Sequence, residues 1–549
     1  MDTCGNNQKK FRLVKSSYWL YSGFTLLVLL ASFHCRPNKT VTKNIILITL
    51  DTLRADHVSL YGTKCAKTPN IDFFAESGVY FQNFYSPIPI TLPAHAAIFY
   101  SQPPHNLKVY NNGQLIPEKM PSPSLAYWLS QNGYETAAFV SLGVLKSHFK
   151  LNQGFDCYED SFPQERWYLN AAEINERVLT WLNKPHRDPF FLWIHYSDPH
   201  DPYAPPVLSP DFRIYLNGKI HSELCLQKNE IINCAFELNP GENTIEFEAL
   251  NKFPIPRDDF RISLNDFEPE ENDFLKLMYE DLTFYRRANK QSVFIKQNGR
   301  IKIQNSGSNI KWKLRFQGNL NLFPEEMSEG YKNEVEYLDS QIGELTEYLE
   351  KSELLENSIV VLAGDHGEGL GEHYLDRGEI YFGHIHYLYT FHTRVPLIIY
   401  DASLRNKSKK IKQFCTLNDI APTLLKMIDL PIPSNYYGND LLNFNSSGES
   451  PEDVFFETYT PEAAADKFAL LRNPWLLVFT PETSTYELYD LQNDPRQQEN
   501  IYIRFQDNPL IQELIKEINH QARKILSTKT EIQFDQKSRE ILKSLGYIK

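Results

Sequence analysis

Strongly apolar runs of six or seven residues recur along the chain, and amphipathic stretches separate them. The run at 45–50 is apolar at five of its six positions, and comparable runs cover 190–196 and 358–363. Runs of this length and character are typical of central strands in a parallel sheet. Residues 165–183 and 326–351 instead repeat apolar positions at helical spacing. We therefore expect an α/β fold, with a mostly parallel sheet flanked by helices.

The pattern changes between residues 212 and 323. Several segments there alternate apolar and polar residues, and Asn-Gly and Pro-Gly pairs separate them. This combination predicts β-hairpins, and we expect an inserted all-β domain with a role in recognition or packing. The expected division of the chain is a signal or anchor segment at 1–40, a first catalytic part at 41–210, the β insertion at 211–323, and a second catalytic part with a C-terminal subdomain at 324–549.

The N-terminus has the pattern of an export signal. Four basic residues precede an apolar run at about 18–33, and Cys35 follows it. A basic region before an apolar region is typical of a signal peptide, and the run is short for a spanning helix, which needs about 20 apolar residues. We expect an exported protein, periplasmic or at the cell surface, with its N-terminus cleaved, lipidated at Cys35 or kept as a membrane anchor. In an oxidising compartment, Cys225 and Cys234 either pair or stay unpaired in neighbouring strands.

Composition excludes some classes of function. The formal net charge is -13, whereas a nucleic-acid-binding protein usually carries a basic patch or stripe. Aromatic residues make up 13% of the chain, which argues against general disorder. The seven cysteines include no Cys-x-x-Cys pair, so no zinc ribbon or redox motif is visible.

Carboxylates and histidines follow several of the predicted central strands. Taken alone, Asp51 after the first run is better explained as a turn or helix-capping residue. The same pattern, an acidic residue or a histidine after an apolar run, recurs at other predicted strand ends. This recurrence favours a ligand site, because ligands bind at the carboxyl ends of strands in open α/β sheets. Carboxylates and imidazoles without cysteine suit a divalent metal such as zinc, manganese or calcium. The residues concerned are Asp51, Asp198, His200, Asp365, His366, His384 and His386.

Thr91 adds a hydroxyl to this set. Pro93 suits the first turn of a helix, which would put Thr91 near a helix N-terminus, where free N–H groups attract an anion. A hydroxyl at such a place is either an N-cap or a nucleophile, and the sequence alone favours the N-cap. Beside a metal the same hydroxyl becomes a nucleophile.

Together these segments resemble the sulfatase family within the alkaline phosphatase superfamily. The resemblance covers residues 44 to about 203, resumes near 331 and runs to the end of the chain, so the β insertion lies outside it. It implies an alkaline-phosphatase/sulfatase-like sheet flanked by helices. The motifs that carry it are, in order, ILITLDTLRADHVSLYG, TPNIDFFAESGVYF, ITLPAHAAIF, HYSDPHDPY, VVLAGDHGEGLGEH, GHIHYLY, TRVPLIIY, NDIAPTLL, ELYDLQNDP and SLGYI.

The resemblance also implies roles for individual positions. Thr91 matches the nucleophile, His200 matches a substrate-pocket histidine, and His384 or His386 falls where sulfatases often carry a substrate lysine and phosphatases a metal histidine. We favour His386 for the substrate. The expected catalytic residues are therefore Thr91, His200 and His386, and the expected metal ligands are Asp51, Thr91, Asp198, Asp365, His366 and His384.

The chain departs from the family at two positions. Thr52 replaces the second Asp of a common sulfatase pair. Typical sulfatases convert a Cys or Ser in a motif that continues with Pro and Arg to formylglycine, whereas this chain has Thr91-Leu-Pro-Ala-His95. Threonine cannot give that aldehyde, because its β-carbon bears a methyl group. A Thr nucleophile resembles the nucleotide pyrophosphatase and phosphoethanolamine transferase branches, which act on phosphate esters with zinc.

We expect a metal-dependent hydrolase of sulfate or phosphate esters that uses a Thr nucleophile. Its substrate would be an anionic ester on a glycan, a lipid or a small molecule, and its N-terminus would associate it with a membrane. Two alternatives remain open. One is a membrane-anchored phosphoethanolamine-type transferase acting on envelope glycans. The other is a catalytically inert surface-binding protein that uses the β insertion.

Overall fold

The computed structural model describes the chain in segments. The apolar run at 18–33 and Cys35 lie outside the described residues. Within them, no helix is both long enough and apolar enough to cross a lipid bilayer. The described segments are 43–62, 66–163, 166–201, 203, 211–225, 231–249, 261–264, 275–287, 290–319, 324–374, 380–404, 409–442, 453–459 and 465–544.

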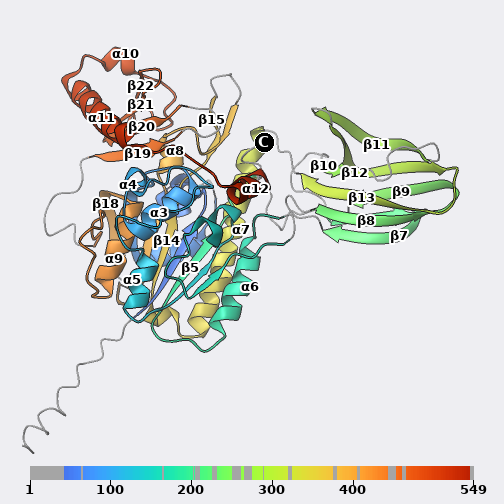
Figure 1. Cartoon of the computed structure of the whole chain (residues 1–549), viewed down its shortest axis with the longest axis horizontal. Coiled ribbons are helices and arrows are strands. Elements are labelled where there is room, and N and C mark those ends of the chain that lie inside the picture. The colour runs from blue at the N-terminus through green and yellow to red at the C-terminus, as the bar shows by residue number, and fades with distance from the viewer. Residues whose placement is uncertain are drawn as a thin grey trace, which may run out of the picture. The chain divides into compact units, whose positions relative to one another are not determined.

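An eight-stranded, mostly parallel sheet lies at the centre of the α/β part (Figure 1), which confirms the expected fold class. In sheet order its strands are β18 (Lys409–Thr416), β2 (Gly78–Tyr85), β17 (Leu397–Asp401), β14 (Ser358–Gly364), β1 (Asn44–Leu50), β5 (Phe190–Tyr196), β3 (Glu135–Phe139) and β4 (Cys157–Glu159). The strand β1 pairs in parallel with β14 and β5. Only β17 is antiparallel to its neighbours. All seven residues of β1 are buried, as its apolar sequence requires in a central strand.

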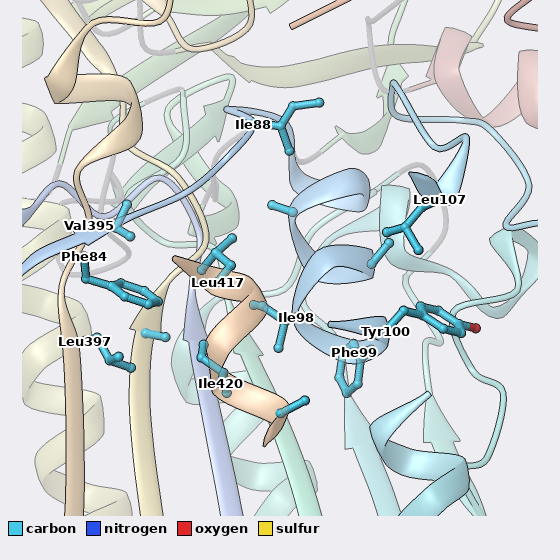
Figure 2. Packing of buried hydrophobic residues seen from close by; sticks show 14 of the residues in the cluster. Phe84, Ile88, Ile98, Phe99, Tyr100, Leu107, Val395, Leu397, Leu417 and Ile420 are labelled. Carbon is cyan, nitrogen blue, oxygen red and sulfur yellow. The ribbon is translucent and has the colours of Figure 1, made fainter. Parts of the chain in front are cut away.

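Helices cover both faces of this sheet. Ile45 and Leu47 belong to one apolar core, and Ile46 and Ile48 to the other, because successive side chains of a strand point to opposite faces. The first core includes residues of α3 (Thr91–Tyr100), α5 (Leu125–Gln131) and α9 (Ile420–Met427). Figure 2 shows Ile98 of α3 beside Ile420 of α9. The second core includes residues of α2 (Pro69–Glu76), α6 (Ala171–Leu182) and α7 (Pro324–Lys351).

The segment between β5 and α7 forms two antiparallel sheets, which confirms the expected all-β insertion. One contains β11 (Leu275–Arg287), β12 (Lys290–Asn305), β9 (Gly241–Ala249), β6 (Asp211–Leu216) and β7 (Lys219–Cys225), and the other contains β10 (Arg261–Leu264), β13 (Ile310–Asn319) and β8 (Ile231–Leu238). Cys234 on β8 is a free thiol. Because β7 and β8 belong to different sheets, Cys225 and Cys234 do not lie in neighbouring strands. The exact limits of the four parts of the chain stay a prediction.

The second half of the chain adds two smaller units. A hairpin of β15 (Gly369–Tyr374) and β16 (Ile380–Gly383) begins just after Glu368 and ends just before His384. Near the C-terminus, an antiparallel sheet is accompanied by helices, and Leu514 of α11 belongs to the same apolar core as Leu477 of β21. These C-terminal elements are β19 (Val454–Thr458), β20 (Lys467–Arg472), β21 (Trp475–Thr480), β22 (Thr485–Asp490), α10 (Tyr502–Phe505), α11 (Pro509–Thr528) and α12 (Gln536–Ser544).

Candidate functional site

Two buried carboxylates meet at the carboxyl ends of adjacent strands. Leu50 of β1 pairs with Gly364 of β14, so Asp51 and Asp365, one residue further along each strand, emerge together. Both side chains are fully buried. Burial raises the pKa of Asp51 well above its usual range, and the charge of Glu368 adds to the effect. Burial and the neighbouring Asp51 raise the pKa of Asp365 in the same direction. Such a pair needs a compensating positive charge if both groups are ionised.

Only one oxygen of the pair is satisfied by hydrogen bonds within the described residues. The backbone N–H groups of Thr52 and His366 donate to Asp365 Oδ1 over 3.1 and 2.7 Å. Thr52 has a φ of 58°, which is uncommon for a β-branched residue, and this conformation turns its N–H toward Asp365. Asp365 Oδ2 and both carboxylate oxygens of Asp51 have no hydrogen-bond partner. Three buried acceptor atoms are therefore available to a cation.

His366 presents a nitrogen lone pair to these oxygens. Its Nδ1–H donates to the carbonyl oxygen of Gly367 over 3.1 Å, which leaves Nε2 as the acceptor atom. Nε2 lies 3.4 Å from Asp51 Oδ1 and 3.5 Å from Asp365 Oδ2. Burial, together with nearby histidines, keeps the pKa of His366 well below its usual value. A neutral imidazole with two carboxylates, whose ligand atoms lie within 4.8 Å of one another, fits a divalent metal.

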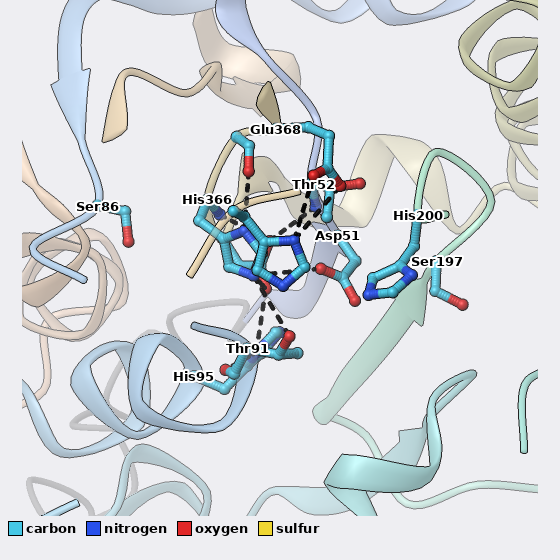
Figure 3. Close-up of polar contacts among 12 residues, drawn as sticks. Asp51, Thr52, Ser86, Thr91, His95, Ser197, His200, His366 and Glu368 are labelled. Carbon is cyan, nitrogen blue, oxygen red and sulfur yellow. Dashed lines mark hydrogen bonds and ion pairs between the residues drawn. The ribbon is translucent and has the colours of Figure 1, made fainter. Parts of the chain in front are cut away.

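Thr91 enters the same space from the start of α3. Its hydroxyl lies 3.3 Å from His366 Nε2, and Figure 3 shows the two side chains facing each other. The N-cap of α3 is Ile90, and no side chain caps the helix. The N-cap interpretation of Thr91, which the sequence alone favoured, is therefore wrong. The next residue, Leu92, gives its N–H to the side-chain oxygen of Asn112 over 2.9 Å.

Two histidines that the sequence analysis did not assign to the site lie directly beside it. His95 is one helical turn after Thr91, and its Nδ1–H donates to the Thr91 carbonyl over 2.7 Å. His195 lies opposite Thr49 in the pairing of β5 with β1. A second group of ligand atoms within 4.8 Å of one another contains His95, His195 and Asp365. The spacing of four residues between Thr91 and His95 places both on one face of a helix, and this could have been recognised in the sequence. The position of His195 could not, because it depends on the register of β5 against β1.

Two more histidines, His384 and His200, lie next to His366. His384 follows the β15–β16 hairpin, and its Nδ1 lies 3.3 Å from Glu368 Oε2. Its ring centroid lies 4.5 Å from that of His366 and 5.3 Å from that of His200. Burial lowers the pKa of His384 to about 4. The Nδ1–H of His200 donates to the Asp201 carbonyl over 2.8 Å, so Nε2 is the acceptor atom of the neutral ring.

Of the expected carboxylates and histidines, Asp198, His200, His384 and His386 belong to neither metal-binding group. Asp198 Oδ1 accepts a hydrogen bond from the N–H of Ala171 over 3.0 Å, at the first residue of α6. The backbone N–H of His386 donates to the Tyr381 hydroxyl oxygen over 3.3 Å, and the two rings lie 5.5 Å apart. The structure thus places His384, rather than His386, against the site histidines.

Two models of protein families match this chain. A family model described as Sulfatase matches residues 43–430. A second model, described as N-sulphoglucosamine sulphohydrolase, C-terminal, matches residues 378–524.

Individual relatives agree with these matches. An N-acetylglucosamine-6-O-sulfatase of Bacteroides thetaiotaomicron is 25% identical over 519 residues, which cover 87% of each chain. A solved structure of a protein in complex with its substrate D-glucosamine-2-N,6-O-disulfate has a TM-score of 0.59 at 17% identity and covers 89% of this chain and 100% of that one. The structure of a phosphonate monoester hydrolase of Agrobacterium radiobacter has a TM-score of 0.54 at 16% identity and covers 89% of this chain and 95% of that one.

Proposed function

We propose, from the premise that this chain belongs to the sulfatase family of the alkaline phosphatase superfamily, that Thr91 is the nucleophile of a metal-dependent ester hydrolase. Membership makes the chain a sulfuric ester hydrolase, since the family model spans most of the α/β part. The nucleophile, the other residue roles and the natural ester are the content of the proposal.

The observation that carries the proposal is the contact of Thr91 with the carboxylate–imidazole group. Its buried hydroxyl faces His366 Nε2 at 3.3 Å and caps no helix. A hydroxyl in a fully buried position normally serves a structural hydrogen bond to the backbone. Here it stands beside the atoms best suited to hold a cation, which is the arrangement that activates a nucleophile.

Asp51, Asp365 and His366 would hold the divalent metal. Bound there, it would favour the alkoxide form of Thr91 and offset negative charge on the ester. Asp51 and Asp365 provide the anionic oxygens, and the N–H groups of Thr52 and His366 keep Asp365 in place. The fit rests on the three buried oxygens that have no hydrogen-bond partner in the described residues.

The remaining residues would bind the ester and protonate its leaving oxygen. The Thr91 hydroxyl loses its proton to solvent water, and its oxygen attacks sulfur. The bond from sulfur to the leaving oxygen breaks, and that oxygen takes a proton from Nε2 of doubly protonated His200, which regains a proton from water. His384, whose Nε2 has no hydrogen-bond partner within the described part of the chain, would line the other side of the ester pocket. The N-terminal end of the α3 dipole adds positive potential where charge develops. Water then cleaves the Thr91 ester and restores the hydroxyl.

Two substrate classes deserve separate tests. Relatives and neighbours that act on sulfated glucosamine support a sulfate ester on a glycan. Thr91 in place of a formylglycine precursor, and a phosphonate monoester hydrolase among similar folds, favour a phosphorus ester. The assembled nucleophile and metal ligands support catalysis over the inert surface-binding alternative.

The test is hydrolysis of matched nitrophenyl esters, namely sulfate, phosphate monoester, phosphate diester and phosphonate, with zinc, manganese and calcium varied. We expect turnover of at least one ester and none with Thr91→Ala. Product that forms only when a glycan acceptor is added would instead support a phosphoethanolamine-type transferase. Turnover that survives Thr91→Ala would contradict the proposed nucleophile.

We also propose that the protein is exported and attached to a membrane through its N-terminus. The support is the sequence alone, in which basic residues precede the apolar run at 18–33 and Cys35 follows. Cell fractionation, compared with a Cys35→Ala variant, distinguishes a lipid anchor at Cys35 from a retained apolar segment.

A further inference from the structure

The hydrogen bonds of Ser141 fix the protonation of His195. The Ser141 hydroxyl donates to Ser197 Oγ over 2.9 Å. A hydroxyl carries a single hydrogen, so Ser141 must accept a hydrogen bond from His195 Nδ1, which lies 2.8 Å away. His195 Nδ1 therefore carries a proton, and Nε2 of the neutral ring is a lone pair.

That lone pair lies close to a buried carboxylate oxygen of Asp51. His195 Nε2 is fully buried and has no hydrogen-bond partner among the residues that the structure describes. It lies 3.8 Å from Asp51 Oδ2, which likewise lacks a hydrogen-bond partner in the described segments. Two buried acceptors facing each other are unfavourable unless a cation separates them. A distance of 3.8 Å is too long for a shared proton. It is close to the separation of roughly 3.4 Å between two tetrahedral ligand atoms at about 2.1 Å from one zinc ion.

This position differs from the one at His366. Asp51 Oδ1 faces His366 Nε2, whereas Asp51 Oδ2 faces His195 Nε2. The two groups of ligand atoms share Asp365 but contain different histidines. Asp51 and Asp365 are therefore placed to bridge two cation positions.

His95 belongs to the second group by distance, but its nitrogens are already committed. The indole N–H of Trp193 donates to Thr49 Oγ1 over 2.9 Å, and the Thr49 hydroxyl in turn donates to His95 Nε2 over 3.0 Å. Its Nδ1–H is given to the Thr91 carbonyl. Because both His95 nitrogens are occupied, His195 is the imidazole of this group that has a lone pair to offer.

The negative charge of the site also favours a second cation. Asp51, Asp365 and Glu368 are all fully buried, and Glu368 interacts electrostatically with Asp51. One divalent ion would leave one of these three negative charges without compensation when all are ionised, and buried charges require a partner. The guanidinium of Arg54 already forms ion pairs with Asp56 and Glu372.

We propose that His195, Asp51 and Asp365 hold a second divalent cation, in addition to the one assigned to Asp51, Asp365 and His366. The inference rests on the proposed function only for the first metal position. An imidazole combined with carboxylates suits zinc or manganese, whereas calcium prefers oxygen ligands alone. The second cation would bind Asp51 from the side of β5 and so fix the carboxylate that both positions share.

The experiment counts metal ions in the full-length protein. Chelator-treated protein is reloaded with zinc or manganese, passed through a desalting column and analysed by mass spectrometry of the elements. We expect two ions per chain in the unchanged protein and one in His195→Gln. His392→Gln, which replaces an equally buried histidine outside both groups, should keep two. One ion per chain in both the unchanged protein and His195→Gln would overturn the proposal.

Two further variants make the result decisive. If His195→Gln does not fold, Ser141→Ala keeps the imidazole but removes the acceptor of its Nδ1–H. We expect it to weaken binding of the second ion about 10- to 100-fold, and unchanged affinity would overturn the proposal. Thr91→Ala should keep two ions while losing turnover. An active Thr91→Ala protein with two ions would thus refute the nucleophile and support the second metal position.

Discussion

The Thr91 hydroxyl and the His366 Nε2 atom lie 3.3 Å apart although 275 positions separate them in the sequence. One comes from the start of α3 and the other from the turn after β14. The fold brings the two side chains together, as Figure 3 shows. It brings a nucleophile candidate to the carboxylate pair.

The first prediction concerns this hydroxyl. Thr91→Val keeps the shape of the side chain and removes only the oxygen, so the core around α3 should stay intact. We expect kcat/KM to fall at least about 10³-fold, as for other lost nucleophiles. Thr91→Ser should keep measurable turnover because it retains the hydroxyl. Equal kcat/KM values for the unchanged protein and Thr91→Val, with unaltered circular dichroism, would refute the nucleophile.

The second prediction separates two neighbouring histidines. His384 is buried against His366 and His200, whereas the His386 ring lies near the rings of Tyr381 and Tyr387. We expect His384→Gln to lower kcat about 10²-fold or more and His386→Gln to change it little. Steady-state kinetics on the best ester of the panel measures both. The reverse order of effects would restore the assignment made from sequence.

Part of the site could be predicted from the sequence. Apolar runs followed by Asp51 or Asp365 located the strand ends, because burial on both faces leaves a clear signature. The pairing of Leu50 with Gly364 places the two carboxylates side by side, and no local pattern specifies that register.

The remaining assignments depended on long-range geometry. The position of His384, rather than His386, beside His366 depends on the β15–β16 hairpin, which ends at Gly383 with a φ of 126°. His195 became a candidate only once β5 lay beside β1. Thr91 has a helix-start sequence whether or not a metal group faces it, so a local rule favoured the N-cap.

The third prediction concerns metal removal. Without a cation, the carboxylates of Asp51 and Asp365 repel each other in a fully buried position. We expect chelation to lower the melting temperature and to abolish turnover, and added zinc or manganese to restore both in a concentration-dependent way. Differential scanning fluorimetry with and without chelator measures the shift. A melting temperature that is indifferent to chelator and metal would argue against a metal at this pair.

The fourth prediction tests the structural role of Asp198. Its Oδ1 accepts the N–H of Ala171 at the first residue of α6, where a negative charge interacts favourably with the helix dipole. We expect Asp198→Asn to lower the free energy of unfolding by about 0.3–1 kcal/mol and to leave the metal content unchanged. Urea unfolding and elemental analysis test the two parts. Loss of a metal ion in Asp198→Asn would return this residue to the ligand set.

The fifth prediction is a pH dependence away from the site. Burial raises the pKa of Asp419 to about 6, although it accepts hydrogen bonds from the N–H groups of Thr416 and Asn439, both over 2.7 Å. Between about pH 4 and pH 6 the native state therefore binds more protons at this group than the unfolded chain does. Its contribution to stability is largest below about pH 4 and falls as the pH rises to 6, by about 3 kcal/mol for a shift of two units.

Replacing this carboxylate isolates its contribution. Asp419→Asn cannot titrate, so the difference in unfolding free energy between it and the unchanged protein should shift in favour of the variant from pH 4 to pH 6. Urea unfolding at intervals of half a pH unit measures that difference. Asp429→Asn, which replaces an exposed carboxylate nearby, serves as the matched control and should run parallel to the unchanged protein. A constant difference between Asp419→Asn and the unchanged protein across this range would mean that Asp419 is ionised in the native state throughout, with its two backbone hydrogen bonds outweighing its burial.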